Sequence, residues 1–594
     1  MNIQRLLSPD AAMSGARMLE SQTFPVLRSP GLQQRNTVAH ALARALKRHG
    51  VELVFGQSLP SLLHLACEAE GIRQIGYRTE NAGGYMADGF ARVAGRPAIV
   101  TAQNGPAAAL LVPALAEALK ASTALVALVQ DVNRDQADRN AFQELDHLQL
   151  FAPVTKWVRR VIEPSRAEDY LEQAFTIACS GRPGPTALLL PADLLMLPRV
   201  AAHRTLSIAH YPLDRPLAAR DATLAAARTL VEAKRPLVIA GGGVHVSQAA
   251  AALAALQESA HLPVATTVMG KGAVDETHPL SIGVVGYFMG PNSATRHQRR
   301  LVEEADVILL VGTRTNQNAT DSWKLYPPAA RYIHIDVDGT EVGRNYEALR
   351  LVGDAQATLI ALGEAMGNLD LSARYAARAM LERRISAGRA AYMTESGAHR
   401  LSTARPVRPE RIMQELQERL YPNSIVVADA SYASIWVANG LTATTAGMRF
   451  VTPRGIAGLG WGFPMALGTK LAAPASTVWC VAGDGGFAHV WSELETAVRM
   501  KIKVSLIVLN NGVLAYQKHA ENMRFGAHTS AVDLCPVDHA AIARACGCRG
   551  IRVEDAEQLK AAFDEAESAA GTTVIDVICD PDAFPPVTFY TPDG

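Results

Sequence analysis

The chain has 594 residues, far too many for one hydrophobic core, and should divide into about three or four domains of ~150 residues each. Lys+Arg and Asp+Glu both number 57, and no block of basic residues stands out, so no nucleic-acid partner is expected. No stretch of ~18 apolar residues could cross a membrane, and the first residues lack the apolar core of a secretory signal. We therefore expect a cytoplasmic protein that makes no membrane contact.

The first third of the chain predicts an arm followed by an α/β domain. Residues 1–35 show no sustained period and are expected to form an N-terminal arm. Between residues 36 and 200, apolar helices alternate with short apolar strands, which predicts a parallel sheet covered by helices on both faces. The four predicted strands are VELVF (51–55), PAIVTAQ (97–103), ALVALVQ (124–130) and TALLLPAD (186–193).

The same alternation recurs twice, in residues 212–370 and again in residues 406–594. An Arg- and Ala-rich stretch predicts a helical linker over 371–405 between these two blocks. The sequence thus predicts an α/β protein with three doubly wound parallel-sheet domains. The later predicted strands lie at 235–240, 263–268, 306–314 and 331–338, and at 424–431, 476–482, 504–509 and 572–580.

The most informative motif is GDG at 483–485, followed after 24 residues (486–509) by NN at 510–511. Both ends follow apolar strands, which places Asp484 and Asn511 at the carboxyl edge of one sheet, where α/β proteins bind ligands. One carboxylate and one amide suit a hard cation such as Mg²⁺ that also holds a diphosphate. The following glycines would let the backbone approach phosphate at the start of a helix predicted over 488–499.

This motif is typical of thiamine-diphosphate enzymes, and the chain resembles that superfamily over nearly its whole length, most closely the acetolactate synthase-like branch. The resemblance implies a pyrimidine-binding domain (36–200), a central domain (212–370) and a diphosphate-binding domain (406–594). It also implies a homodimer or homotetramer with active sites between subunits. The segments that carry it include GYRTENAGGYMADGFARVAGRP (76–97), AFQELDHLQLFAPVTKW (141–157), HIDVDGTEVGRNY (334–346) and GIAGLGWGFPMALG (455–468).

The activity implied by the resemblance depends on thiamine diphosphate and Mg²⁺ and makes or breaks a C–C bond next to a carbonyl. The expected reaction is 2-ketoacid decarboxylation with carboligation, a transferase or lyase activity. Three alternatives on the same cofactor stay open: a simple 2-ketoacid decarboxylase, a 2-hydroxyacyl-CoA lyase or oxalyl-CoA decarboxylase-like enzyme, and a dione hydrolase. A non-catalytic partner subunit is a further alternative, against which the intact Glu80, Asp484 and Asn511 argue.

Glu80 matches the glutamate that activates the cofactor in this family. The 4′-imino group takes the C2 proton of the thiazolium only when N1′ of the pyrimidine is protonated or hydrogen-bonded by an acid, and a buried glutamate does this. The alternative is a simple helix-end charge that complements the helix dipole. Leu459 matches the bulky apolar residue that bends the cofactor, and the backbone carbonyl of Ala457 would accept from the 4′-amino group.

Four polar residues are candidates for the substrate side: Gln103, Asn104, Gln143 and Lys156, each of which could instead be an ordinary surface residue. Tyr516 and Ala520 stand where the family has a Met and an acceptor-selecting Trp, so we expect a larger and more polar acceptor site.

Taken together, the resemblance assigns catalysis to Glu80, Leu459, Gln103, Gln143 and Lys156. It assigns metal binding to Asp484, Asn511 and the backbone carbonyl of Val513. It assigns cofactor binding to Glu80, Ala457, Leu459, Gly483, Asp484, Gly485, Gly486, Asn511 and Val513.

Whether the central domain binds FAD stays open. The glycines at 241–243 after an apolar strand could admit a dinucleotide. However, the pattern that flanks the flavin in acetolactate synthases reads Thr315-Asn316-Gln317-Asn318 here, and related domains hold ADP, CoA or nothing.

Overall fold

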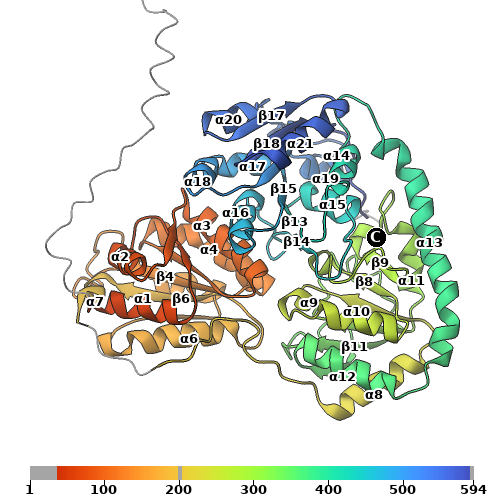
Figure 1. The fold of residues 1–594 in the computed structure, drawn as a ribbon, viewed down its shortest axis with the longest axis horizontal. Coiled ribbons are helices and arrows are strands. Elements are labelled where there is room, and N and C mark those ends of the chain that lie inside the picture. The colour runs from red at the N-terminus through yellow and green to blue at the C-terminus, as the bar shows by residue number, and fades with distance from the viewer. Residues whose placement is uncertain (1–35, 199–203, 589–594) are drawn as a thin grey trace, which may run out of the picture.

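A computed structural model describes residues 36–198 and 204–588, and the predicted arm at 1–35 lies outside them. The described chain forms three six-stranded sheets in which every strand pairing is parallel, as predicted (Figure 1). Figure 1 shows the first domain in red and orange, the central domain in yellow and green, and the third domain in cyan and blue. Within the described residues, every helix is too short or too polar to cross a lipid bilayer.

The first domain has the strand order β2-β1-β3-β4-β6-β5. Its central strands are almost fully buried because helices cover both faces of the sheet. Its elements are α1 (Val38–Arg48), β1 (Leu53–Phe55), α2 (Ser61–Ala69), β2 (Arg73–Ile75), α3 (Glu80–Ala94), β3 (Ala98–Ala102), α4 (Pro106–Ala121), β4 (Leu125–Asp131), α5 (His147–Phe151), β5 (Trp157–Arg160), α6 (Ala167–Cys179), β6 (Thr186–Pro191) and α7 (Ala192–Met196).

The central domain has a different strand order, β9-β8-β7-β10-β11-β12. This is the 3-2-1-4-5-6 order of doubly wound dinucleotide-binding sheets, whose switch point lies between β7 and β10. Its elements are α8 (Arg220–Glu232), β7 (Pro236–Ala240), α9 (Gly243–Val246), α10 (Ala250–Ser259), β8 (Val264–Thr266), β9 (Ser281–Val284), α11 (Arg299–Glu303), β10 (Val307–Val311), β11 (Arg331–Asp336), β12 (Ala348–Val352) and α12 (Ala355–Gly367).

The third domain repeats the topology of the first, in the order β14-β13-β15-β16-β18-β17. The long helix α13 (Ser372–Arg400) leads to it along the outer edge of the molecule (Figure 1). Its elements are α14 (Pro409–Gln417), β13 (Ile425–Ala428), α15 (Tyr432–Gly440), β14 (Arg449–Val451), α16 (Gly462–Ala472), β15 (Val478–Gly483), α17 (Asp484–Phe487), α18 (Glu493–Arg499), β16 (Ser505–Asn510), α19 (Ala515–Phe525), α20 (His539–Ala545), β17 (Arg549–Val553), α21 (Leu559–Ser568) and β18 (Thr573–Ile578).

Helices α3 and α16 join the first and third domains at very close range. A Cβ added at Gly89 would lie 2.2 Å from the Met465 carbonyl oxygen, and one at Gly468 would lie 1.8 Å from that of Met86. Only glycine therefore permits this approach. One hydrophobic core runs across the contact from the first sheet to the third, so the helix that begins at Glu80 is fixed relative to the loop before α16.

Candidate functional site

Asp484 and Asn511 follow adjacent parallel strands and lie at the carboxyl edge of the third sheet. Strands β15 and β16 pair with Gly483 opposite Leu509, so the two residues leave the sheet side by side. The predicted helix over 488–499 is wrong in its bounds. The chain turns into α17 directly at Asp484, continues through a 3₁₀ turn (Ala488–Val490) and resumes as α18 at Glu493.

The Asp484 carboxylate is buried, and its Oδ2 accepts a hydrogen bond from the Gly512 amide at 2.8 Å. Burial raises the pKa of this carboxyl to about 6, so the ionised form gains from a nearby cation. The Asn511 Oδ1 accepts from the Val513 amide at 3.2 Å. Among the described residues no cluster of three or more His, Cys, Asp or Glu could hold a metal by itself, so a hard cation here would need further oxygens from a ligand.

These residues line a cavity of about 500 Å³, here called the main cavity, within the range of small-molecule sites. A Cβ added at Gly483 would meet no atom within 4 Å, so the strand end faces open space. The predicted residues that line the main cavity are Ala457, Leu459, Gly483, Asp484, Gly485, Gly486, Asn511 and Val513. The predicted residues Glu80, Gln103, Gln143 and Lys156 are not among those that line it.

Two buried carboxylates hold the loop that carries Ala457 and Leu459. Asp429 accepts hydrogen bonds at the end of the loop from the amides of residues 460, 461 and 462, at 3.0, 3.0 and 3.1 Å. Glu117, from the first domain, accepts at its start from the amides of residues 455 and 456, at 2.8 and 2.7 Å. Between the two anchors, Ala457 adopts φ +60°, a left-handed conformation that a non-glycine residue rarely keeps without such support.

Arg92 supplies the charge that lets Glu117 be buried. Its Nη2 lies 2.9 Å from Glu117 Oε1, and the guanidinium also binds Asp88 through two hydrogen bonds of 3.0 and 2.7 Å. Its Nη1 donates to the Thr452 carbonyl at 2.8 Å, so the same arginine also holds the loop. This cluster was not predicted from the sequence, although a glutamate within the apolar run PAAALLVPALAEALKA was a visible signal.

Glu117→Gln is expected to lower both stability and activity, because an amide cannot balance Arg92 and loosens the loop at Ala457. We expect a loss of roughly 1–3 kcal/mol of unfolding free energy and a lower kcat. Thermal unfolding and turnover, each measured beside the exposed control Glu418→Gln, test this. If Glu117→Gln matches the control in both measurements, the anchoring role is wrong.

Glu80 is the first residue of α3, where it also serves as the acidic residue of the first helical turn. Thr79 caps the helix by accepting from the Ala82 amide at 3.5 Å. The expectation of a buried glutamate is not met within one chain: Glu80 is only half-buried. Glu80 also does not line the main cavity of its own chain.

A buried carboxylate from the third domain holds the segment in front of Glu80. Glu493 accepts from the Arg78 amide at 3.1 and 3.2 Å and from the Thr79 amide at 3.2 Å. Burial raises the pKa of Glu493, and the Thr496 hydroxyl donates to it at 2.8 Å. The third domain therefore fixes the backbone on which Glu80 is presented.

Three of the predicted substrate residues lie together in the first domain. Gln103 Nε2 donates to Gln143 Oε1 at 2.7 Å, and Asn104 Nδ2 donates to the carbonyls of Phe142 and Gln143 at 3.2 and 3.1 Å. Gln143 has φ +59°, so these bonds support a strained backbone. Gln103, Asn104 and Gln143 thus form a polar patch beside the strongly exposed Phe142.

Lys156 does not belong to this patch. Its ammonium donates to the carbonyls of Ile177, Ser180 and Arg182 at the end of α6, the last two at 2.9 and 2.8 Å. Burial lowers its pKa to about 8. These contacts indicate that Lys156 stabilises a helix end, which gives no geometric support to the predicted substrate role.

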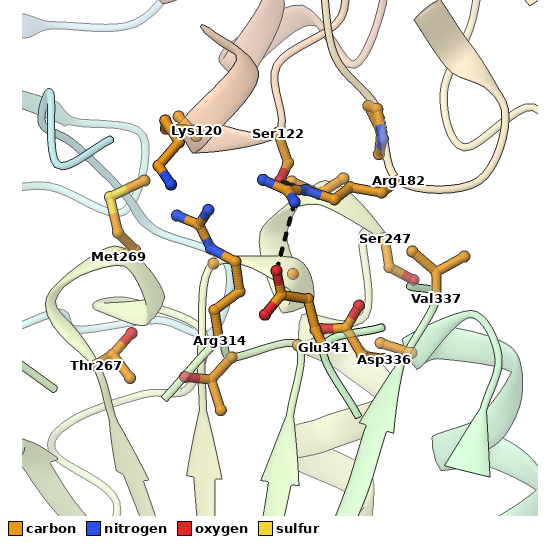
Figure 2. Close-up of a pocket in the computed structure, with 18 of the residues that line it drawn as sticks. Lys120, Ser122, Arg182, Ser247, Thr267, Met269, Arg314, Asp336, Val337 and Glu341 are labelled. Atoms are coloured by element: carbon orange, nitrogen blue, oxygen red, sulfur yellow. Dashed lines mark hydrogen bonds and ion pairs between the residues drawn. The ribbon is translucent and has the colours of Figure 1, made fainter. Parts of the chain in front are cut away.

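A second pocket, here called the interdomain pocket, lies where the first domain meets the switch point of the central sheet (Figure 2). Gly242 and Gly243 follow β7, and the predicted glycine turn thus faces this pocket. Figure 2 shows Lys120 and Arg182 reaching in from the first domain and Arg314 from the central domain. Arg182 lies 3.6 Å from Glu341 across the pocket. Arg314, the third residue after the end of β10 at Val311, was not predicted from the sequence.

Comparisons with known proteins agree with this architecture. Three family models match: the N-terminal TPP binding domain (residues 36–150), the central domain (224–362) and the C-terminal TPP binding domain (429–577) of thiamine pyrophosphate enzymes. A probable acetolactate synthase large subunit of Methanocaldococcus jannaschii is 30% identical over 574 residues, covering 92% of this chain and 93% of that protein.

Two further relatives carry related names. An acetolactate synthase large subunit of Parasynechococcus marenigrum is 32% identical, covering 91% of this chain and 87% of that protein. The acetolactate synthase isozyme 3 large subunit of Escherichia coli is 30% identical, covering 89% and 92%. The chain belongs to the thiamine pyrophosphate enzyme family and, within it, to the acetolactate synthase-like branch.

Proposed function

We propose that this thiamine-diphosphate enzyme also requires Mg²⁺ and joins two 2-ketoacids with loss of CO₂. The observation that carries the proposal is the main cavity, in which the oxygen pair of Asp484 and Asn511 and the anchored loop at 457–459 line one space. When bound, thiamine diphosphate supplies the sink for the electron pair that CO₂ leaves behind.

The residues present fit the cofactor and the metal. Asp484, Asn511 and the Val513 carbonyl would hold Mg²⁺, whose remaining ligands would be diphosphate oxygens. The Ala457 carbonyl would accept from the 4′-amino group, and Leu459 would hold the bent shape by packing. Glu80 would keep a proton at N1′ of the pyrimidine.

The proposed reaction balances without an oxidant or a reductant. One 2-ketoacid breaks its C1–C2 bond and releases CO₂, and its C2 forms a new bond to the carbonyl carbon of the second. The carbonyl oxygen of the acceptor takes one proton. The products are one 2-hydroxy-3-ketoacid and CO₂.

The proposal includes a site shared by two copies of the chain. Within the described residues, the main cavity is lined only by residues of the central and third domains, so Glu80, Gln103 and Gln143 are absent from it. Phe142 is 84% exposed beside Gln143, which suits a surface that a second chain covers. A second copy would thus complete the cavity with its first domain.

For the interdomain pocket we propose a phosphate-bearing nucleotide, of which FAD is one. Its position at the switch point of a 3-2-1-4-5-6 sheet supports this, as do its four cationic side chains, Lys120, Arg182, Arg314 and Arg454. Its volume of about 120 Å³ is below the ~300–1,000 Å³ of small-molecule sites. The pocket therefore suits part of a dinucleotide, and a whole FAD would need the Arg182–Glu341 contact to open.

Product analysis separates the proposed reaction from its alternatives. Purified protein with Mg²⁺ and thiamine diphosphate is expected to convert pyruvate to CO₂ and a 2-hydroxy-3-ketoacid in a 1:1 ratio. Free aldehyde as the main product would indicate a simple decarboxylase instead, and turnover only of a CoA thioester would indicate a CoA-dependent enzyme. Asp484→Ala protein serves as the inactive control.

A further inference from the structure

Arg454 is the one cationic side chain among the described residues that line the main cavity. It lies in the loop between β14 and α16, three residues before Ala457, and also borders the interdomain pocket. The cavity wall around it comes from two domains, because Tyr287 belongs to the central domain and Tyr516 to the third.

Neutral groups hold the guanidinium of Arg454 in place. Its Nη1 donates to the Tyr287 hydroxyl at 3.1 Å and its Nη2 donates to the Ser434 hydroxyl. The guanidinium carbon lies 5.7 Å from the ring centroid of Phe288. Its Nε is buried and has no hydrogen-bond partner among the described residues. The side chain is thus fixed while its charge stays available.

The acidic side chains of the main cavity do not balance this charge. Asp429 accepts from the loop amides, and Asp580 pairs with Arg408 at 2.9 Å. Asp484 follows β15 as part of the proposed metal site. Among the described residues, Arg454 forms no ion pair with a carboxylate. A half-buried guanidinium without an acidic partner favours binding of an anion.

The surrounding wall is phenolic. Tyr432 and Tyr516 pack edge to face with ring centroids 5.6 Å apart, and the Tyr432 hydroxyl lies 2.8 Å from His519 Nδ1. Burial raises the pKa of Tyr516, so its hydroxyl stays a neutral hydrogen-bonding group. Hydroxyls and one guanidinium make a wall that suits a carboxylate rather than an alkyl group.

We propose that Arg454 binds the carboxylate of the acceptor 2-ketoacid, a proposal that rests on the function proposed above. The donor is the less suitable partner. A cation held against the carboxylate that leaves as CO₂ would stabilise the ground state more than the transition state, where that charge is lost. The acceptor keeps its carboxylate throughout, so binding it costs nothing at the chemical step.

The test compares an acid acceptor with a neutral one. Arg454→Gln is expected to raise the KM for the 2-ketoacid acceptor roughly 10- to 100-fold. With acetaldehyde as the acceptor, both its CO₂ release and its ligation should stay near the wild type. Arg454→Lys should recover part of the lost acceptor affinity, because lysine keeps the positive charge but cannot make the paired hydrogen bonds of a guanidinium to a carboxylate. Arg524→Gln removes an exposed cation from α19 outside the cavity and should change neither.

Equal losses with the acid and the neutral acceptor would overturn the proposal, because they would indicate that Arg454 only holds Tyr287 and Ser434. An unchanged KM for the acid would overturn it as well. So would loss of ADP binding, measured by equilibrium dialysis, with an unchanged acceptor KM, since Arg454 would then serve the interdomain pocket.

A binding measurement keeps this test separate from the proposed function. If the wild type ligates no acid, the carboligase proposal fails, and saturation-transfer NMR with propionate and propionamide then decides the role of Arg454. Propionate signals that are strong in the wild type and lost in Arg454→Gln support an anion site. Equal propionate and propionamide signals in both proteins overturn it.

Discussion

Asp484→Ala is expected to lose thiamine diphosphate binding by at least ~100-fold, more than a change outside the metal's direct ligands would cause. The Asp484 carboxylate is the only charged group among the proposed ligands. It is buried, so folding has already removed most of its contact with water. Because the diphosphate must complete the Mg²⁺ shell, metal and cofactor should bind interdependently. Calorimetry with both, and with each alone, measures this directly.

Two controls make the result specific. Asp484→Asn keeps an acceptor for the Gly512 amide but removes the charge, so it should also bind poorly while its stability stays close to the wild type. Asp582→Ala removes an exposed carboxylate of the same domain and should bind normally. If Asp484→Ala binds the cofactor as strongly as the wild type, the assignment of the metal site to Asp484 and Asn511 is wrong.

The strands in the middle of each sheet could be predicted from the sequence, and those at the edges could not. The predicted strands are the four inner strands of every sheet, which read as continuous apolar runs because helices cover both faces. The missed strands are β2, β5, β9, β12, β14 and β17, all at sheet edges. Strands such as RQI and RGIRV are partly exposed and carry no apolar period of two.

The site shows the same division between local and distant signals. Asp484 and Asn511 were readable because each follows a strong strand and the spacing reflects one βαβ unit. Glu117 stood out only as a charged residue in an apolar run. Its role and that of Arg454 could not be predicted, because they depend on contacts with segments 167 or more residues away, at the Gly455 amide and the Tyr287 hydroxyl. Lys156 stood in a matching motif, yet its position at the end of α6 could only be seen in three dimensions.

Glu80→Gln is expected to keep the fold and the cofactor but to lower turnover roughly 10²- to 10⁴-fold. An amide fits the same space at the start of α3, where it cannot supply a proton to N1′ of the pyrimidine. Calorimetry should give a near wild-type affinity, and NMR should show slowed exchange of the C2 proton in deuterated water. Glu68→Gln, an exposed change in α2, serves as the matched control. An unchanged exchange rate would overturn the role of Glu80.

The most direct test of a thiamine-diphosphate site shared by two chains is to mix these two inactive proteins. In a mixed dimer of Glu80→Gln and Asp484→Ala chains, one site receives both intact residues. With complete exchange, half of the dimers are mixed, and about a quarter of wild-type activity should return. Native mass spectrometry of differently tagged chains shows whether exchange occurs. Exchange without any return of activity would contradict the account, because Glu80 and Asp484 would then have to act within a single chain.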